Sequence, residues 1–503
     1  RQASTVIAMF LLLASVTVNA GQQIWQDMTL EQARFRGVDA GISYFNADDV
    51  ALRNLLGQVP HRSSGDFSHQ IQLPMPDGSL ARFRIIESPI MEDGLAQHYP
   101  DVKTFKVFGI DDKYASGRVD ITARGFSGIL QTSGGRIFID PDHSSSQANF
   151  YSSKYRSSGQ PGQPFSCGVH QLNQDREFSQ NVESRTAQRI PGMLLEYRLA
   201  VSATEEYVAA LYDHSRTDSA EDQAQDAIVT TINRVNQIFE RDLGIRLVLV
   251  ANNQQLIDNG ANVSFSNYDP TAMFKQNANW INDVVGIDNY DIGHVFSTGG
   301  GGLARIGSVC DNTSGFYGTR KAHGVTGLSN PIGDPFYIDY VAHEIGHQFG
   351  AEHSFNGRTS HCGGGNRVAA SAFEPGSGST IMGYAGICGV ENLQLNSDDT
   401  FHAGSISQIN VFTDRAGLLA CATQSPTFNA DPVIVTPTED RVIPLNTPFV
   451  LDKGTVIDND PLVYQWDQMN TGTATDANSF GTDLGNNPLF RSYKPSAESR
   501  RNF

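Results

Sequence analysis

One stretch restricts the fold of this chain more than any other feature, namely HEIGHQFGAEH at residues 343–353. On a helix, residues four apart differ by only about 40° around the axis, so His343 and His347 face the same way. Gly350 lets the backbone leave the helix in a sharp turn, which returns His353 to the same point. Three neutral imidazoles around one ion leave a fourth position open, as in a catalytic rather than a structural zinc site. The alternative is a polar helix face with unrelated histidines.

A second motif, STIMGY at residues 379–384, lies downstream. Together with HExxHxxGxxH it resembles the pattern of the metzincins, zinc endopeptidases in which a methionine turn lies beneath the metal. The resemblance covers roughly residues 192–422. It implies an α/β catalytic domain with a mixed sheet, long helices and an active-site helix, acting on protein or peptide substrates. An edge strand of that fold binds an extended peptide, and Gly299–Leu303 is the candidate for it.

The resemblance also implies roles for single residues. Zinc polarises the substrate carbonyl and lowers the pKa of its water from about 15.7 to about 7. Glu344, next to the first histidine, takes the proton and passes it to the leaving amine. Met382 forms an apolar floor and binds nothing. For Tyr384 two roles stay open, a stabiliser of the oxyanion and an aromatic packed in the turn.

The branch of the family stays open as well. GLARIGSVC at residues 302–310 resembles the stretch of reprolysins or adamalysins that leads to a cysteine paired near the end of the domain. However, Ser354 stands where reprolysins usually have Asp, as in many matrixins, and a tyrosine two residues after the methionine is similar to astacins and serralysins. By the reprolysin resemblance Cys310 pairs with Cys421, and Cys362 with Cys388. Four cysteines allow three pairings, and spacing does not choose among them.

The fifth cysteine, Cys167, stands alone upstream. Its surroundings, PFSCGV at residues 164–169, are similar to the propeptide cysteine switch of matrixins, without the arginine that usually precedes the cysteine. A thiolate is a good fourth zinc ligand and would displace the water needed for hydrolysis, so the resemblance implies a latent precursor. A stray exposed thiol and an intermolecular disulfide are the alternatives.

The chain is long enough for several domains. A short apolar run, Val6–Ala14, followed by Val18-Asn-Ala20, predicts a secretory signal and hence an extracellular protein that can hold disulfides. The predicted organisation is a signal peptide (1–20), a β-rich propeptide with Cys167 (21–190), the metzincin domain (191–424), and a linker with a partial Ig- or cadherin-like β-sandwich (425–503).

Local patterns support this division. Ser79–Ile86 and Arg118–Phe126 are predicted strands, and Ser144–Gln163 has the composition of a flexible linker. Arg185 and Arg189 are candidate processing points. The later region alternates predicted strands with one long helix, and its segments are Leu194–Val201, Ser219–Leu243 (the helix, ended by Gly244), Ile245–Val250 and Tyr290–Phe296.

In the last region, short apolar runs at 442–443, 449–451 and 462–466 predict the sandwich. Asp458-Asn-Asp-Pro461 resembles the acidic loops of cadherin-like and polycystic-kidney-disease-type repeats, so a Ca²⁺ site and a plain solvated turn are both open. Four other histidines lack partners at ligand spacing and are predicted to be structural: His294, His323, His361 and His402.

The formal net charge of -18 disfavours nucleic acid and anionic membranes as partners. After the signal no apolar stretch is long enough for a transmembrane helix, and the oligomeric state is not indicated. Two other functions compete: a catalytically inactive metzincin-fold adhesion or binding protein, and a zinc hydrolase for a non-peptide bond. The presence of Glu344 favours the endopeptidase over the inactive protein.

Overall fold

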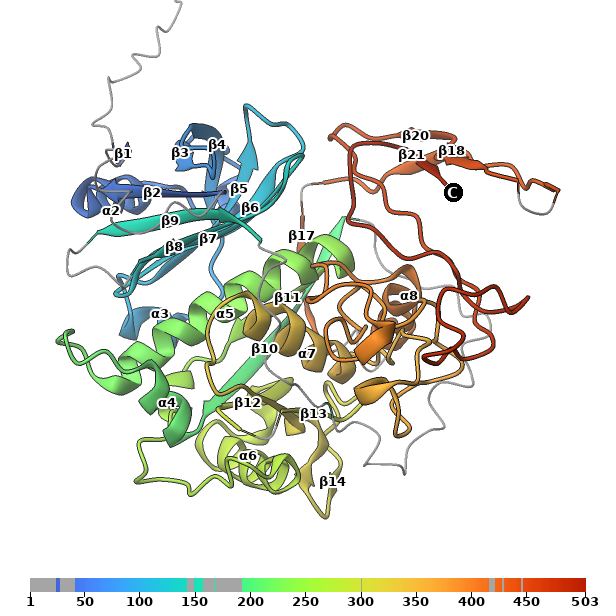
Figure 1. Ribbon diagram of the computed structural model, residues 1–503. Helices are drawn as coiled ribbons and strands as arrows, with labels where there is room; N and C mark the ends of the chain where they lie inside the picture. The colour runs from blue at the N-terminus through green and yellow to red at the C-terminus, as the bar shows by residue number, and fades with distance from the viewer. Residues whose placement is uncertain are drawn as a thin grey trace, which may run out of the picture.

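The computed structural model describes residues 24–27, 41–142, 149–156, 167, 192–299, 301–415, 421–427, 429–444 and 447–503. The predicted signal peptide and the candidate processing points Arg185 and Arg189 lie outside these residues. The described chain forms a β-rich N-terminal region and an α/β region, and the long helix α5 lies between their sheets (Figure 1). No helix in the described ranges combines the length and apolarity needed to cross a bilayer.

The N-terminal region is built on one antiparallel sheet in the order β1-β2-β9-β8-β7-β6-β5-β4-β3. Its core consists of apolar side chains from alternate positions, among them the fully buried Trp25, Phe105 and Phe126. Its strands are β1 (Trp25–Asp27), β2 (Ile42–Ala47), β3 (Gln70–Pro74), β4 (Leu80–Glu87), β5 (Lys103–Gly109), β6 (Ser116–Thr122), β7 (Gly125–Thr132), β8 (Gly135–Pro141) and β9 (Phe150–Tyr155), with helices α2 (Asp49–Gly57) and α3 (Asp93–His98).

Two sequence predictions in this region need correction. Arg118–Phe126 is not one strand, because the chain turns between β6 and β7, where Gly125 adopts φ +115° and Thr122 pairs with Gly125. The predicted linker Ser144–Gln163 contains β9, which pairs with both β2 and β8. Hydrogen bonding to two neighbouring strands outweighs the polar composition of this segment.

The α/β region has a mixed sheet in the order β11-β10-β12-β16-β13, with β17 also pairing with β10. Its inner strands are parallel, whereas β13 and β17 are antiparallel to their partners. The strands are β10 (Met193–Ala203), β11 (Ile245–Leu249), β12 (Ile292–Ser297), β13 (Gly302–Ala304), β16 (Gly324–Gly327) and β17 (Thr423–Pro426), with a small ribbon of β14 (Ser314–Gly315) and β15 (Gly318–Thr319).

The helices of this region are α4 (Glu205–Leu211), α5 (Ala220–Leu243), α6 (Pro270–Val284), α7 (His343–Gln348) and α8 (Ala403–Thr413), and a π-helix (Pro335–Ala342) precedes α7. Short 3-10 turns lie at Arg62–Ser64, Asn253–Leu256, Ile287–Asn289, Arg320–Ala322, Ser360–Cys362 and Gly389–Glu391. The largest apolar core lies between the mixed sheet, α5 and α7, and includes Ile232, Phe239 and Phe349.

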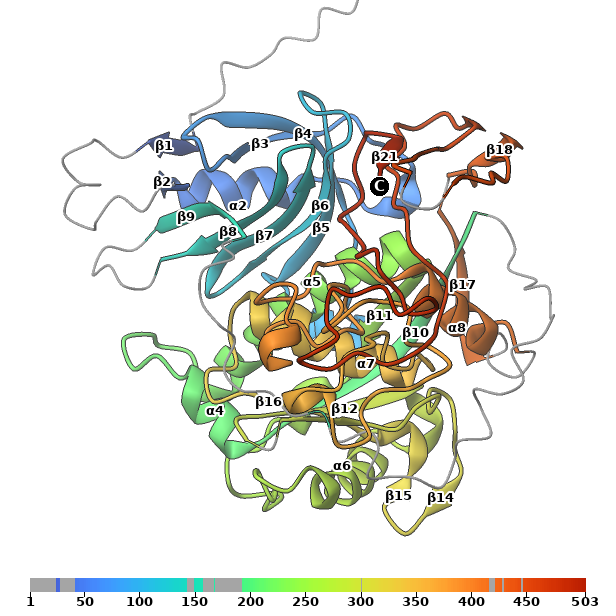
Figure 2. The same cartoon turned by 45° about the vertical axis from the view of Figure 1, so that its right-hand side comes forward.

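Helix α5 begins and ends where the sequence predicts. The Ser219 side chain accepts a hydrogen bond from the Asp222 amide at the start, and Gly244 ends the helix with φ +60°. Almost every side chain between these ends is buried, because the N-terminal sheet covers the face of α5 that the mixed sheet does not (Figure 2).

The contact between α5 and the N-terminal sheet includes buried polar pairs as well as apolar side chains. Glu240 at the end of α5 receives the Arg118 guanidinium at 2.9 Å and the Lys106 amine at 2.8 Å, both from the N-terminal sheet. Farther along, Asp120 accepts hydrogen bonds from Thr230 at 2.8 Å and Asn233 at 2.9 Å. A buried charge is stable only when it has a partner, so each buried charged group on one region requires an opposite charge or a hydrogen-bonding group on the other.

The last region does not show the predicted sandwich among its described residues. It contains two separate ribbons, β18 (Val433–Thr436) with β20 (Thr455–Ile457) and β19 (Val450–Asp452) with β21 (Arg500–Asn502). Much of the remaining chain, residues 464–496, packs on the α/β region instead. For example, Thr475 donates to Glu391 at 2.7 Å, and Ser379 donates to the Ser492 carbonyl at 3.0 Å.

Candidate metal centre

Helix α7 carries the first two histidines of the motif. His343 and His347 lie on one face of it, and their Nε2 atoms are 3.1 Å apart. Both side chains are buried, and burial lowers the pKa of His343 to about 4, although the hydrogen bond to the Ile381 carbonyl opposes the shift. A neutral imidazole is the form that binds a metal.

Gly350 ends this helix as the sequence predicts, with φ +94°, a conformation that strains any residue with a side chain. The turn brings His353 back, so that its Nε2 lies 3.1 Å from Nε2 of His347. All three histidines of the motif therefore direct the same ring atom to one point.

The hydrogen bonds of the three Nδ1 atoms determine which ring nitrogen can bind a metal. Each Nδ1 faces a backbone carbonyl: Ile381 at 2.7 Å from His343, Ala351 at 2.6 Å from His347, and Asn366 at 2.8 Å from His353. A carbonyl can only accept, so Nδ1 must carry the proton and Nε2 presents its lone pair. Three converging lone pairs repel one another unless a cation lies between them.

Cys167 joins the histidines. Its Sγ lies 3.8 Å from Nε2 of His347, and the four candidate ligand atoms all lie within 4.8 Å of one another. In a tetrahedral zinc site with ordinary bond lengths, nitrogen ligands are about 3.3 Å apart and nitrogen and sulfur about 3.6 Å. The distances of 3.1 and 3.8 Å thus fit zinc, and three imidazoles with one thiolate are donors that zinc favours.

The backbone at Cys167 also contacts the mixed sheet. Cys167 forms a parallel bridge with Gly302, the first residue of β13, and β13 is the edge strand. The predicted edge strand Gly299–Leu303 is therefore displaced by a few residues along the chain. Cys167 itself therefore bridges the strand expected to hold an extended peptide.

Glu344 lies next to these ligands and is fully buried. Neither carboxylate oxygen has a regular hydrogen-bond partner within the described part of the chain. Burial raises the pKa of Glu344 to about 8, and the neighbouring Cys167 thiol opposes this shift. A buried carboxyl group whose pKa lies near neutrality, beside three converging imidazoles, is suited to exchange protons.

Met382 and Tyr384, which belong to the methionine turn, pack against residues of the ligand motif. A side chain at Gly346 would approach the Met382 sulfur to 2.8 Å, so the methionine packs directly against α7 between the two histidines. The Tyr384 ring lies 4.5 Å from the His353 ring and 4.5 Å from the Phe355 ring. Burial, together with Cys167 and Glu344, raises the pKa of Tyr384, so its hydroxyl stays protonated.

A small cavity of about 20 Å³ adjoins the centre and is lined by His343, Tyr384 and Asp339, among others. The Tyr384 hydroxyl has no hydrogen-bond partner among the described residues. Its packing against His353 is observed, and its action on an oxyanion stays a prediction.

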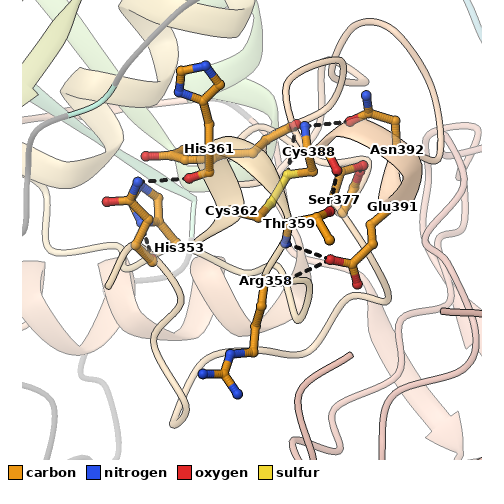
Figure 3. Close-up of a disulfide and its surroundings, with 12 residues drawn as sticks. His353, Arg358, Thr359, His361, Cys362, Ser377, Cys388, Glu391 and Asn392 are labelled. Atoms are coloured by element: carbon orange, nitrogen blue, oxygen red, sulfur yellow. Dashed lines mark hydrogen bonds between the residues drawn. A yellow bond between two sulfur atoms is a disulfide. The ribbon is translucent and has the colours of Figure 1, made fainter. Parts of the chain in front are cut away.

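Both disulfides join the cysteines that the resemblance implied. Cys310 pairs with Cys421, and Cys362 pairs with Cys388. Figure 3 shows the second disulfide beside the loop of His353 and beside Glu391, whose carboxylate accepts from the Arg358 and Thr359 amides. Cys167 stays outside both disulfides.

The other histidines have structural contacts. His294 lies between Gln348 and Thr326, each at 2.9 Å. His323 stacks on Phe274, and His402 caps α8. The proposed calcium loop gains no support, since Asp458 accepts from the Asp460 amide at 2.7 Å and belongs to no group of three candidate ligands in the described chain.

One residue near the centre was missed by the sequence prediction. Glu374 is fully buried. Its carboxylate accepts hydrogen bonds from Ser354, which follows His353, and from Ser379 and Thr380 at the start of the methionine turn. No motif marks it, because its partners are brought together only by the fold.

Residues 221–412, which include α5, α7 and the methionine turn, match the model of Reprolysin_2, the metallopeptidase family M12B, reprolysin-like. This region is therefore similar to metallopeptidases that act on proteins or peptides and typically use zinc. No curated protein matches the chain. Among solved structures, metalloproteinase-II from Bacteroides fragilis matches with 14% identity and a TM-score of 0.32, over 62% of this chain and 88% of that one. At this TM-score the structural match adds nothing to the assignment.

Proposed function

We propose that the chain is an exported zinc endopeptidase of the metzincin type, made as a latent precursor whose N-terminal region is the propeptide. The observation that carries the proposal is the set of four ligand atoms within 4.8 Å, three imidazole nitrogens and the Cys167 sulfur. The similarity of residues 221–412 to M12B metallopeptidases supports it. Two disulfides fit an oxidising compartment.

His343, His347 and His353 would hold zinc, which supplies Lewis acidity toward the scissile carbonyl and toward a water molecule. Glu344 then accepts the proton of the attacking water on a carboxylate oxygen and delivers it to the leaving nitrogen. The edge of β13 aligns an extended peptide through main-chain hydrogen bonds. The scissile carbonyl would lie near Tyr384, and the protonated Tyr384 hydroxyl would donate a hydrogen bond to the oxyanion.

Two contacts of the N-terminal region support the proposed latency. Cys167 would fill the fourth ligand position, and its backbone bridges Gly302, the first residue of β13, so it would exclude both water and substrate. The buried ion pairs at Glu240 hold the rest of the region on α5, away from the cleft. Release of Cys167 is therefore the step that opens the site.

Casein cleavage by the purified full chain tests both parts. The precursor should not cleave casein. Treatment with a thiol-reactive mercurial, or the substitution Cys167→Ser, should activate it before any cleavage of the chain itself occurs. Glu344→Ala in the Cys167→Ser background should lose nearly all of this activity while still binding zinc.

His361→Ala is the matched control. His361 lies in the same loop as the third ligand (Figure 3) but is not in the ligand cluster. Equal activity with and without Glu344 would defeat the mechanism, whereas zinc binding without any casein cleavage in the Cys167→Ser chain would favour an inactive binding protein. If neither the mercurial-treated precursor nor the Cys167→Ser precursor cleaves casein, the proposal that Cys167 causes latency is wrong.

A further inference from the structure

Glu374 lies at the centre of a small polar network. Its side chain is fully buried. One carboxylate oxygen accepts from the Ser354 hydroxyl at 2.6 Å and from the Thr380 hydroxyl. The other accepts from the Ser379 amide at 2.8 Å and the Thr380 amide at 3.2 Å. Donors surround the carboxylate, and this compensates the loss of water around a buried charge.

The two groups of donors come from different parts of the metal centre. Ser354 directly follows His353. Ser379 and Thr380 open the methionine turn, and the next residue, Ile381, supplies the carbonyl that orients His343 at 2.7 Å. Glu374 thus joins the backbone behind the third ligand to the backbone behind the first.

The main chain repeats this connection. The Glu374 amide donates to the Ser354 carbonyl at 2.9 Å, and the Ser354 amide donates to the Met382 carbonyl at 3.0 Å. Three segments, at Ser354, Glu374 and the methionine turn, therefore form one hydrogen-bonded unit, and the Glu374 carboxylate bonds to both of the other segments.

A glycine at position 378 leaves room for the Glu374 carboxylate beside the methionine turn. Gly378 has φ +68°, and a Cβ built there would lie 3.2 Å from both the Glu374 carboxyl carbon and one of its oxygens. Neither the left-handed conformation nor this distance suits a larger residue. Replacement by an amide removes the charge that these donors stabilise, and the Ser354 and Thr380 hydroxyls, which donate to one oxygen, would have to turn and accept from the amide nitrogen instead.

We propose that Glu374 is a positioning residue for the zinc site: by clamping Ser354 to the methionine turn it holds His353 and His343 at the separation that zinc requires. The proposal rests on the proposed function, since it takes these histidines as ligands. Outer partners of metal ligands commonly change metal affinity by about 10- to 100-fold when they are mutated.

Glu391 provides a matched control. It is also fully buried, and its carboxylate accepts from the Arg358 and Thr359 amides at 2.7 and 2.8 Å and from Thr475 at 2.7 Å (Figure 3). None of these donors adjoins a zinc ligand. Glu391→Gln should thus perturb a buried carboxylate of the same kind in the same region without moving the histidines.

The test measures zinc affinity of the full chain by chelator competition, and the absorption spectrum of the cobalt-substituted protein. Glu374→Gln should weaken zinc binding by about 10- to 100-fold and alter the cobalt bands, whereas Glu391→Gln should stay within about threefold of the wild type. Ser354→Ala, which removes a single donor, should weaken binding in the same direction by a smaller factor and still fold.

Equal zinc affinities for Glu374→Gln and Glu391→Gln would overturn the proposal. If Glu374→Gln does not fold, a wild-type affinity and unchanged cobalt bands in Ser354→Ala would overturn it. A wild-type chain that binds no zinc would instead refute the proposed function, so the two failures are distinguishable.

Discussion

Glu240→Gln tests whether buried ion pairs hold the N-terminal region on α5. The Glu240 carboxylate contacts Arg118 at 2.9 Å, Lys106 at 2.8 Å and Arg246 at 2.5 Å. The Arg118 and Arg246 side chains are 0% and 3% exposed. The substitution leaves the Arg118 guanidinium buried without an ion pair, whereas Arg246 keeps its pair with Glu196 at 3.0 Å. Breaking a buried pair in this way costs about 3–5 kcal/mol, and the lower value applies here because the amide oxygen still accepts.

The assay is thermal unfolding of the full chain. A loss of about 3 kcal/mol corresponds to a fall of about 6–12 °C in the melting temperature for domains of this size. The control is Glu87→Gln, which breaks a more exposed pair with Lys103 and should cost no more than about 1 kcal/mol. A melting temperature of Glu240→Gln that equals that of Glu87→Gln would refute the reasoning.

The pH dependence gives a second check on the same variant. Burial raises the pKa of Glu240, but Arg246, Lys106 and Arg118 outweigh it and hold the pKa well below the ordinary value of 4.5. An acid with a lowered pKa contributes stability above its unfolded pKa and loses it as pH falls through the folded value. The difference between wild type and variant should therefore persist from pH 8 to about pH 5, and a difference that vanishes in this range would contradict the assignment.

Three further predictions concern other contacts. Burial raises the pKa of Asp120 to about 6, so between about pH 4 and 6 the folded chain holds a proton that the unfolded chain has lost. The free energy of unfolding should therefore fall by on the order of 2–3 kcal/mol as pH rises from about 4 to 6. Unfolding curves of Asp120→Asn should lack this dependence. Gly350→Ala should reduce zinc affinity in chelator competition by about tenfold through strain at φ +94°, whereas Gly481→Ala, with φ +77° and open space around it, should not. Replacing Cys310 and Cys421 by serine opens a loop of 111 residues and should cost about 4.8 kcal/mol in denaturant unfolding, against about 3.5 kcal/mol for the 26-residue loop of the other disulfide.

The sequence predicts best the features that depend on spacing within one segment. Helix periodicity places His343 and His347 on one face, and Gly350 supplies the turn that returns His353. The same local logic predicts both ends of α5 at Ser219 and Gly244. Each of these depends on residues only a few positions apart.

Features that depend on distant partners were not predictable. Glu374 has its role only because the fold brings Ser354 and the methionine turn to it. The pair of Arg118 and Glu240 joins residues more than a hundred positions apart. The strand β9 and the packing of residues 464–496 on the α/β region are likewise decided by tertiary contacts, which composition does not report.

X-ray absorption at the zinc edge of the intact full chain tests the central claim most directly. We predict one zinc per chain, with three nitrogen ligands at about 2.0–2.1 Å and one sulfur at about 2.3 Å, and with the sulfur replaced by oxygen in Cys167→Ser. A purified chain without stoichiometric zinc, or zinc whose ligands include no imidazole nitrogen, would contradict the claim that His343, His347 and His353 form the metal centre.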